Sequence, residues 1–451
     1  MDGALRSVAS LSRRGRLPGG WIEDGELHPD KLEKAAPPDA GQLTLDLYGH
    51  LPDTRITDIL LEADEDTGFT EAFTDLRKGA PCTDKIGLLS VILADGVNLG
   101  LKKMAASGST HSHMELLRIA RWHVDQEAYD RALAMVVDAQ SALPMARLWG
   151  EGLTSSSDGQ FFPAGGPGEA IGLVNARYGT EPGVKAYSHV SDQYAPYSVF
   201  TIPTTASEAP YVLDGLTMNE VGQRIREHYT DTGGFSDQVF AACSILGYAF
   251  APRIRDLPDK RIYAFDPKGA PKALQPLIAR RVRTDLIERN WPDILRLAAS
   301  MSLGTVVPSE ILRKLASYPR QNELAEALRE VGRVERSLFM LRWVADPDLQ
   351  RRAQTGLNKG EAHHALKRAI AFHRRGEIHD RTAEGQHYRM AGLNLLAMIV
   401  IYWNTKRLGD MVVKLAGEGA PPDPALLRHV SPLGWEHIHL AGEYRWPAPA
   451  A

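Results

Sequence analysis

The chain has 451 residues, of which 43% are hydrophobic and 24% charged, and a formal net charge of −4. These values are typical of a globular protein with two or three domains and exclude a disordered or fibrous chain. Two widely separated cysteines, Cys82 and Cys243, exclude a disulfide framework or a cysteine-rich zinc site, so we expect a reducing, cytoplasmic compartment. The longest apolar run, residues 395–403, is too short to cross a bilayer and predicts a buried helix and no membrane partner.

The first third of the chain is predicted to be helical after an irregular start. Residues 1–50 contain the breakers RRGRLPGG and KAAPPDAG and are predicted to be a linker or a frayed start. Residues 51–150 are predicted to be an all-helical domain. Their first helix has apolar residues at a spacing of i, i+3, i+4 and i+7, namely Ile56, Ile59, Leu60 and Ala63.

The pattern changes to short β-rich segments near Thr154. The segments SSDGQFF, VKAYSHVSDQY and YSVFTIPTT, followed by a helix, a strand, a helix and a fifth strand, predict a mixed sheet within residues 151–265. Residues 266–355 are predicted to be a helical insertion, and 356–451 a helix that completes the core, followed by a helical tail. The predicted fold class is therefore α/β plus all-α.

Basic residues are concentrated in one part of the chain. Residues 251–375 contain 25 Lys and Arg against 14 Asp and Glu, although the whole chain is acidic. Such a block indicates a polyanion as partner. Solvated helix faces are the alternative explanation.

Three acids stand where a metal site could form. Asp158 lies in the first predicted strand, and Asp231 follows the strand HYT. Glu361 is predicted at the N-terminal end of a helix. It lies there beside an apolar stripe that consists of Ala362, Ala365, Leu366, Ala369 and Ile370. Three carboxylates suit two hard divalent cations that carry out phosphoryl transfer. Taken singly, each acid is as well explained by a turn or by the helix dipole.

Five blocks in a fixed order give the chain a recognisable pattern. The blocks are SSDGQFF, HVSDQYAPY, HYTDTGGFSDQVF, LNKGEAHHALKRAI and SPLGWEHIHLAGEYRW. Together they resemble the replicative, cointegrate-forming DDE transposases of the Tn-three family, over residues 15 to 446.

This resemblance implies a ribonuclease H-like catalytic core with Asp158, Asp231 and Glu361 as its catalytic, metal-holding acids. It implies two Mg²⁺ ions, for which Mn²⁺ can substitute, and no small-molecule substrate. The family cleaves DNA at transposon 3′ ends and joins these ends to target DNA, working as a homodimer in the bacterial cytoplasm near the nucleoid. Family members are about twice as long, so we expect a chain truncated before its end-recognition domains.

Five further residues are candidates for DNA contact. Gln160 is on the face of the first strand that carries Asp158, and His189 and Gln193 belong to the HVSDQY cluster. For these three a satisfied polar network at the strand ends is an equal alternative. Lys359 and Arg368, close to Glu361, are candidates for backbone phosphates, with solvation as the alternative.

Two rival functions differ in class from a transposase. A truncated, catalytically silent remnant would act as a non-specific DNA-binding or dimerising protein. A two-carboxylate glycosidase is excluded because it has no need of the basic block, and because the aromatic content is only 7%.

Overall fold

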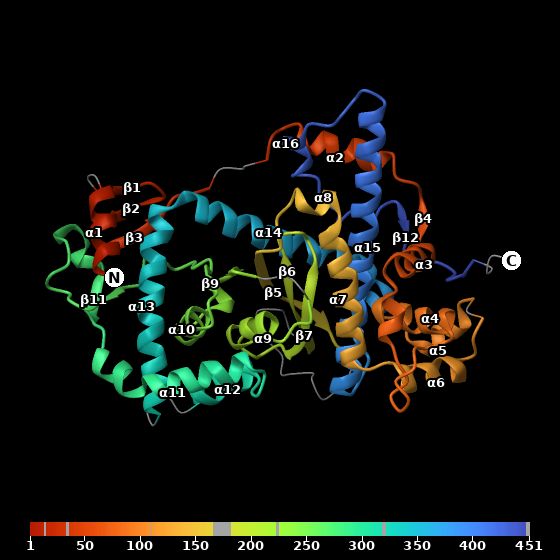
Figure 1. The fold of residues 1–451 in the computed structure, drawn as a ribbon, viewed down its shortest axis with the longest axis horizontal. Helices are drawn as coiled ribbons and strands as arrows, with labels where there is room; N and C mark the ends of the chain where they lie inside the picture. Colours follow the sequence, from red (N-terminus) through yellow and green to blue (C-terminus); the bar gives the residue numbers. More distant parts are fainter. Residues whose placement is uncertain are drawn as a thin grey trace.

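The computed structural model describes residues 1–12, 15–32, 36–108, 110–165, 182–221, 225–317 and 322–447. A twisted central sheet lies between a helical region that contains the long α15 and a second helical region built around α13 (Figure 1).

The central sheet has five strands in the order β7-β6-β5-β8-β9. Strands β5, β6 and β7 are antiparallel neighbours, whereas β8 and β9 run parallel to β5. The strands are β5 (Thr154–Pro163), β6 (Gly183–Ser191), β7 (Pro196–Pro203), β8 (Glu227–Thr230) and β9 (Ala249–Phe250). The predicted mixed five-stranded sheet is therefore confirmed.

Helices α3 to α8 fill residues 56–147, where sequence analysis predicted helices. The elements are α3 (Ile56–Thr67), α4 (Lys85–Gly96), α5 (Leu101–Ala106), α6 (His113–His123), α7 (Gln126–Ala142) and α8 (Pro144–Arg147). The four apolar residues of the predicted first helix are all buried in α3. Chain direction changes between α6 and α7, where the side chain of Asp125 accepts a hydrogen bond from the Ala128 N–H and so begins a new helix.

Helix α15 (Ala383–Gly417) is the central support of this region. Its segment 395–403 is buried on all sides, as predicted, and packs against α7, α4 and β7. Within the described ranges, no helix is both long and apolar enough to span a membrane. The short strand β12 (Ile438–His439) pairs in parallel with β4 (Thr54–Arg55), so segments from both parts of the chain close this region.

The prediction of a linker or frayed start for residues 1–50 is wrong. This segment forms α1 (Asp2–Leu11), β1 (Arg16–Leu17), β2 (Gly20–Glu23), β3 (Glu26–Pro29) and α2 (Ala40–Gly49). Leu5 and Leu27 are almost fully buried, and α1 and the small sheet pack beside α13 (Figure 1). Gly19 and Gly20 of RRGRLPGG lie between and in the antiparallel strands β1 and β2, and Gly41 of KAAPPDAG lies in α2.

The segment after β9 is mainly helical but not wholly so. It contains β10 (Ile262–Ala264), β11 (Ile278–Arg281), α11 (Thr284–Ser302), α12 (Pro308–Ser317), α13 (Glu323–Ala345) and α14 (Pro347–Ile370). Strands β10 and β11 pair in parallel. The predicted boundary at residue 356 falls inside α14, because the polar sequence from Pro347 onward is helical too. Shorter helices are α9 (Val212–Thr217), α10 (Asp237–Ile245) and α16 (Pro424–Leu427).

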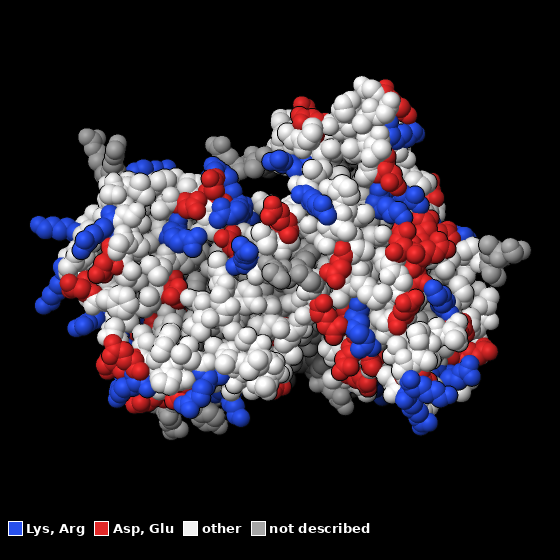
Figure 2. Space-filling view, in the orientation of Figure 1, with Lys and Arg blue, Asp and Glu red and all other residues white. Residues whose placement is uncertain are grey.

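The basic block does not form one continuous patch on the face drawn in Figure 2, where Lys and Arg are interspersed with Asp and Glu. Many of its arginines form ion pairs, among them Arg280 with Glu330, Arg329 with Glu326 and Arg352 with Glu227. Part of the predicted polyanion signal therefore reflects internal charge networks.

Candidate active site

Asp158 and Asp231 lie on two neighbouring parallel strands, each directly after the residues through which these strands pair. Residues 154–157 of β5 pair with 227–230 of β8, so Asp158 comes directly after the paired part of β5 and Asp231 directly after β8. The Asp158 carboxylate accepts a hydrogen bond from the Gly159 N–H at 2.8 Å, and that of Asp231 accepts one from the Gly233 N–H at 2.8 Å. Among the described residues, one group of acids has carboxylate oxygens within 4.8 Å of one another, and it consists of Asp158, Asp231 and Glu208.

Glu208 was missed by sequence analysis. It lies between β7 and the 3₁₀ turn Ala209–Tyr211, and only 5% of its surface is exposed. The Nζ of Lys185, on β6, is 2.8 Å from its Oε1 and also donates to the Ala206 carbonyl at 2.9 Å. A lysine inside the apolar strand VKAYSHV was the available signal, because a buried lysine needs an acidic partner.

Burial and the neighbouring carboxylates raise the pKa of Asp158. Burial, followed by the charges of Asp231 and Glu208, raises the pKa of Asp158 to about 7, against the opposing hydrogen bond from Gly159. Since 31% of the Asp158 side chain is exposed, solvent screens part of this effect. Oxygen donors crowded in this way are the ligands that Mg²⁺ prefers, so the residues present fit a divalent cation.

Glu361 is placed differently from the prediction. Helix α14 begins at Pro347, so Glu361 lies well inside the helix and not at its N-terminal end, and both Glu361 and Ala362 are exposed. Its carboxylate is outside the group of three, although its charge makes a further, smaller contribution to the raised pKa of Asp158. Glu361 is therefore near the two aspartates without joining them.

Helix α14 lies directly on β5. The Ser156 hydroxyl donates to the Gly356 carbonyl at 2.8 Å, and Gln160 Nε2 donates to the His364 carbonyl at 3.0 Å. Gly356 allows this approach, because a Cβ there would lie 2.5 Å from the ring of Tyr229. The contacts hold the helix that carries Glu361 against the strand that carries Asp158.

The serines before Asp158 fix β5 on both faces. Ser156 binds α14, whereas the hydroxyls of Ser155 and Ser157 contact the two ring nitrogens of His228 at 2.7 and 2.8 Å. Burial lowers the pKa of His228 well below its ordinary value, so the ring is neutral. The serine run is thus structural, and it sets the position of the acid that follows.

Three of the predicted DNA contacts are buried. Gln160, His189 and Gln193 are 4%, 0% and 2% exposed. His189 Nε2 contacts the Val212 carbonyl at 3.0 Å, and Gln193 Nε2 donates to the Gly150 carbonyl at 3.0 Å. These contacts match the polar network, which was the alternative, and the DNA-contact prediction finds no support in this conformation.

Lys359 and Arg368 have different surroundings. Lys359 is 9% exposed, donates to the Asp192 carbonyl and lies 4.7 Å from the centre of the Tyr194 ring. Burial lowers its pKa to about 8. Arg368 is exposed on α14. A cavity of about 350 Å³ lies between the start of β5 and α14, and Lys359, Arg351 and Arg352 contribute to its lining.

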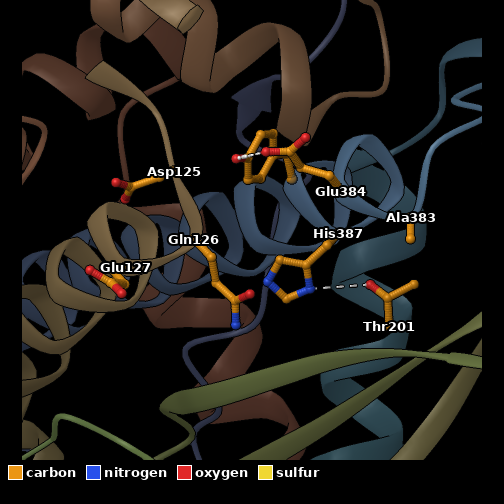
Figure 3. A pocket seen from close by; sticks show the side chains of 8 residues that line it. Asp125, Gln126, Glu127, Thr201, Ala383, Glu384 and His387 are labelled. Atoms are coloured by element: carbon orange, nitrogen blue, oxygen red, sulfur yellow. Dashed lines mark hydrogen bonds between the residues drawn. The ribbon is translucent and has the colours of Figure 1, made fainter. Parts of the chain in front are cut away.

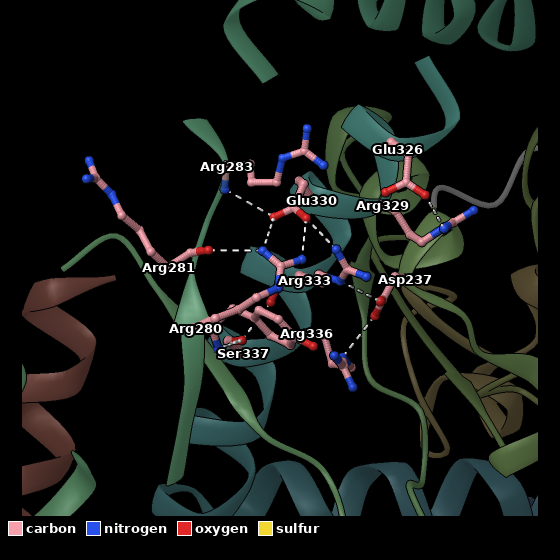
Figure 4. Close-up of polar contacts among 11 residues, drawn as sticks. Asp237, Arg280, Arg281, Arg283, Glu326, Arg329, Glu330, Arg333, Arg336 and Ser337 are labelled. Carbon is pink, nitrogen blue, oxygen red and sulfur yellow. Dashed lines mark hydrogen bonds and ion pairs between the residues drawn. The ribbon is translucent and has the colours of Figure 1, made fainter. Parts of the chain in front are cut away.

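An ion-pair network holds the segment that follows Asp231 (Figure 4). Asp237, the first residue of α10, pairs with Arg333 and Arg336 of α13, and Arg333 also pairs with the fully buried Glu330. Arg280 of β11 donates to the same Glu330 carboxylate at 2.6 Å. The helical insertion therefore fixes α10, which begins six residues after Asp231.

A larger hollow of about 530 Å³ lies elsewhere, between the start of α7, β7 and the start of α15 (Figure 3). His387 points into it beside Thr201, with 3.5 Å between Thr201 Oγ1 and His387 Nδ1. Its charged lining residues are Asp125, Glu127 and Glu384, a negative set that does not suit a phosphate backbone.

Comparison with known proteins places the chain in a family. The model of the Tn3 transposase DDE domain matches residues 58–444. The chain belongs to the Tn3 family of DDE transposases. It is 47% identical to the transposase of transposon Tn501 from Pseudomonas aeruginosa, over 99% of this chain and 45% of that protein.

Other members of the Tn3 family give the same result. The chain is 49% identical to the Tn3926 transposase of Escherichia coli, over 100% of this chain and 46% of that protein. It is 39% identical to the Tn1546 transposase of Enterococcus faecium, over 98% of this chain and 44% of that protein. The chain thus spans about half the length of the curated relatives that it matches.

Proposed function

We propose that the chain is the catalytic region of a transposase that cleaves DNA at transposon 3′ ends and joins these ends to target DNA. The observation that carries the proposal is the position of Asp158 and Asp231, side by side on two parallel strands in a chain of the DDE family. The strand order, three antiparallel strands followed by two parallel ones, supports a ribonuclease H-like core.

In the proposed mechanism, Asp158 and Asp231 hold two divalent cations, Mg²⁺ or Mn²⁺. When bound, such a pair activates the attacking oxygen and stabilises the leaving oxygen of an in-line displacement. A cation held there would favour the deprotonated form of Asp158, against the burial and the neighbouring charges that raise its pKa. Glu361 completes the set from α14, which the contacts from Ser156 and Gln160 already hold on β5.

The basic residues on and near α14 are proposed to hold the DNA backbone without reading its sequence. Arg351, Arg352 and Arg368 are exposed, and Lys359 lies at the adjoining cavity. Lysine and arginine contacts to phosphate supply affinity and position, not sequence specificity. The product is proposed to be a cointegrate, formed by a homodimer on paired transposon ends, as the family assignment suggests.

A strand-transfer assay tests this function. The purified 451-residue chain is incubated with Mg²⁺, pre-cleaved transposon-end DNA and a plasmid target. We expect joined product, and with Asp158→Ala we expect the level of a reaction containing EDTA, because one metal-holding carboxylate is gone. Asp348→Ala removes an exposed acid at the start of α14 and is the matched control, with product as in the unchanged chain.

The absence of product from a folded chain that binds DNA would contradict the catalytic proposal. The chain would then be a DNA-binding protein without activity of its own. The exposed position of Glu361, outside the group of three acids, would then explain the lack of activity.

A further inference from the structure

Glu208 approaches the two aspartates from the opposite side of the sheet to α14. Successive side chains of a strand point to opposite faces. Asp158 and Gln160 share the face that α14 covers, whereas Gly159 is paired with Tyr187 and faces the other way. Glu208 contacts this second face at Gly159, yet its carboxylate oxygen is within 4.8 Å of those of Asp158 and Asp231.

The missing side chain of Gly159 makes this approach possible. A Cβ at residue 159 would lie 2.7 Å from Oε1 and 3.0 Å from Cδ of Glu208. Contacts this short require one of the two groups to move. The glycine after Asp158 therefore leaves the space through which a carboxylate from beyond β7 reaches the middle of β5.

Lys185 balances the charge of Glu208. The two side chains are 4% and 6% exposed, so solvent screens the attraction between their charges only weakly. A buried carboxylate without a cation is strongly unfavourable. The ammonium group of Lys185 is thus a cation at the edge of a cluster of three acids, and a divalent cation bound by the cluster would compete with it for Glu208.

We propose that Glu208 is a metal-contacting carboxylate of the catalytic centre, admitted by Gly159, and that Lys185 is the cation with which it pairs when no metal ion is bound. The inference rests on the proposed function, since it concerns the same cations. The two residues of the pair have opposite roles: the Glu208 carboxylate binds the ion, and the Lys185 ammonium group opposes ion binding. A salt bridge with a structural role alone gives both residues the same effect.

Mn²⁺ binding by the full chain, measured by electron paramagnetic resonance and calorimetry without DNA, tests the proposal. We expect Glu208→Gln to weaken binding on the order of 10-fold, the size found for residues that support metal ligands. Lys185→Met should tighten binding, because the ion no longer competes with the ammonium group. Asp64→Asn alters another buried, ion-paired acid, on α3, and should leave Mn²⁺ binding unchanged.

A second variant keeps the proposal testable if Glu208→Gln does not fold. Gly159→Ala keeps every carboxylate and the N–H that binds Asp158, but displaces Glu208, and it should weaken Mn²⁺ binding in the same direction as Glu208→Gln. Thermal unfolding in EDTA identifies any variant that does not fold, and the result from such a variant is replaced by that from Gly159→Ala.

The outcomes separate this inference from the proposed function. If Asp158→Asn loses Mn²⁺ binding while Glu208→Gln and Gly159→Ala bind as the unchanged chain does, the role of Glu208 is refuted and the metal site stands. Weaker binding by Lys185→Met as well as Glu208→Gln would also refute it, because the pair would then be structural. Unchanged binding by Asp158→Asn would refute the metal site itself.

Discussion

At the scale of single residues, Lys367 combines a charge with complete burial. Its Nζ donates to the Ser188 hydroxyl at 2.7 Å, and its side chain has 0% exposure. Burial lowers its pKa from the ordinary 10.5 to about 7, and its charge contributes to the lowered pKa values of His363 and His364 beside it. The folded chain therefore prefers a neutral Lys367, which the unfolded chain does not.

The preference of the folded chain for a neutral Lys367 predicts how the free energy of unfolding changes with pH. Between about pH 7 and pH 10.5 the unfolded chain binds a proton at Lys367 that the folded chain does not, so this residue makes stability rise with pH. The slope is at most about 1.4 kcal/mol per pH unit. Urea unfolding at pH 7.5 and 9.5 should show this rise, and Lys367→Met should remove it.

Lys414→Met, at an exposed position of α15, is the control for Lys367→Met and should keep the pH slope of the unchanged chain. Equal slopes in all three proteins would show that the Lys367 ammonium remains charged in the fold.

At the scale of elements, a buried charge network joins α4 to α15. Arg389 donates to the Asp95 carboxylate and to the Ala94 carbonyl, each at 2.8 Å. Tyr129 of α7 donates to the other Asp95 oxygen at 2.8 Å, and Arg389 also pairs with Asp380. Three helices thus depend on one guanidinium group that is 11% exposed.

Removing that guanidinium group should be costly. We expect Arg389→Met to lower the free energy of unfolding by roughly 3–5 kcal/mol, because Asp95 would remain buried without its cation. Arg407 lies on the same helix as Arg389 and forms a more exposed ion pair with Glu62 of α3. Arg407→Met should therefore cost less than about 1 kcal/mol. Urea unfolding measures both, and similar losses would contradict the difference in burial as the cause.

At the scale of the whole molecule, two hydrophobic cores share one sheet. Ala186 and Val199 belong to the core that contains α4, α7 and α15, whereas Tyr187 and Ile202, on the same two strands, belong to the core that contains α10 and α13. Strands whose two faces serve different cores link the stability of both.

The shared strands predict that the cores unfold together. In hydrogen exchange followed by mass spectrometry, Arg389→Met should reduce the protection of α13 as well as that of α7, although the substitution lies in the first core. Unchanged protection of α13 would show two independent units. Arg407→Met again serves as the control and should leave both helices protected.

Sequence analysis predicted what depends on local pattern. The sheet, the buried face of α3, and the positions of Asp158 in the first strand and of Asp231 after the strand HYT follow from periodicity and from nearby glycines. Glu208 could not be predicted, because its place depends on a close approach across Gly159 between segments 49 residues apart. Glu361 was misplaced within its helix because the segment from Pro347 onward is mostly polar, and its apolar stripe consists of only Leu349, Ala353 and Leu357.

The parallel pairing of β4 with β12 has a consequence for protein synthesis. Helices α3 to α8 share their core with α15 and with residues up to Tyr444, which are made more than 230 residues later. At about 5–20 residues per second, the nascent helices wait roughly 10–50 seconds before the ribosome delivers their partner. During that interval their apolar faces are exposed, and a chaperone that binds such faces would protect the emerging chain.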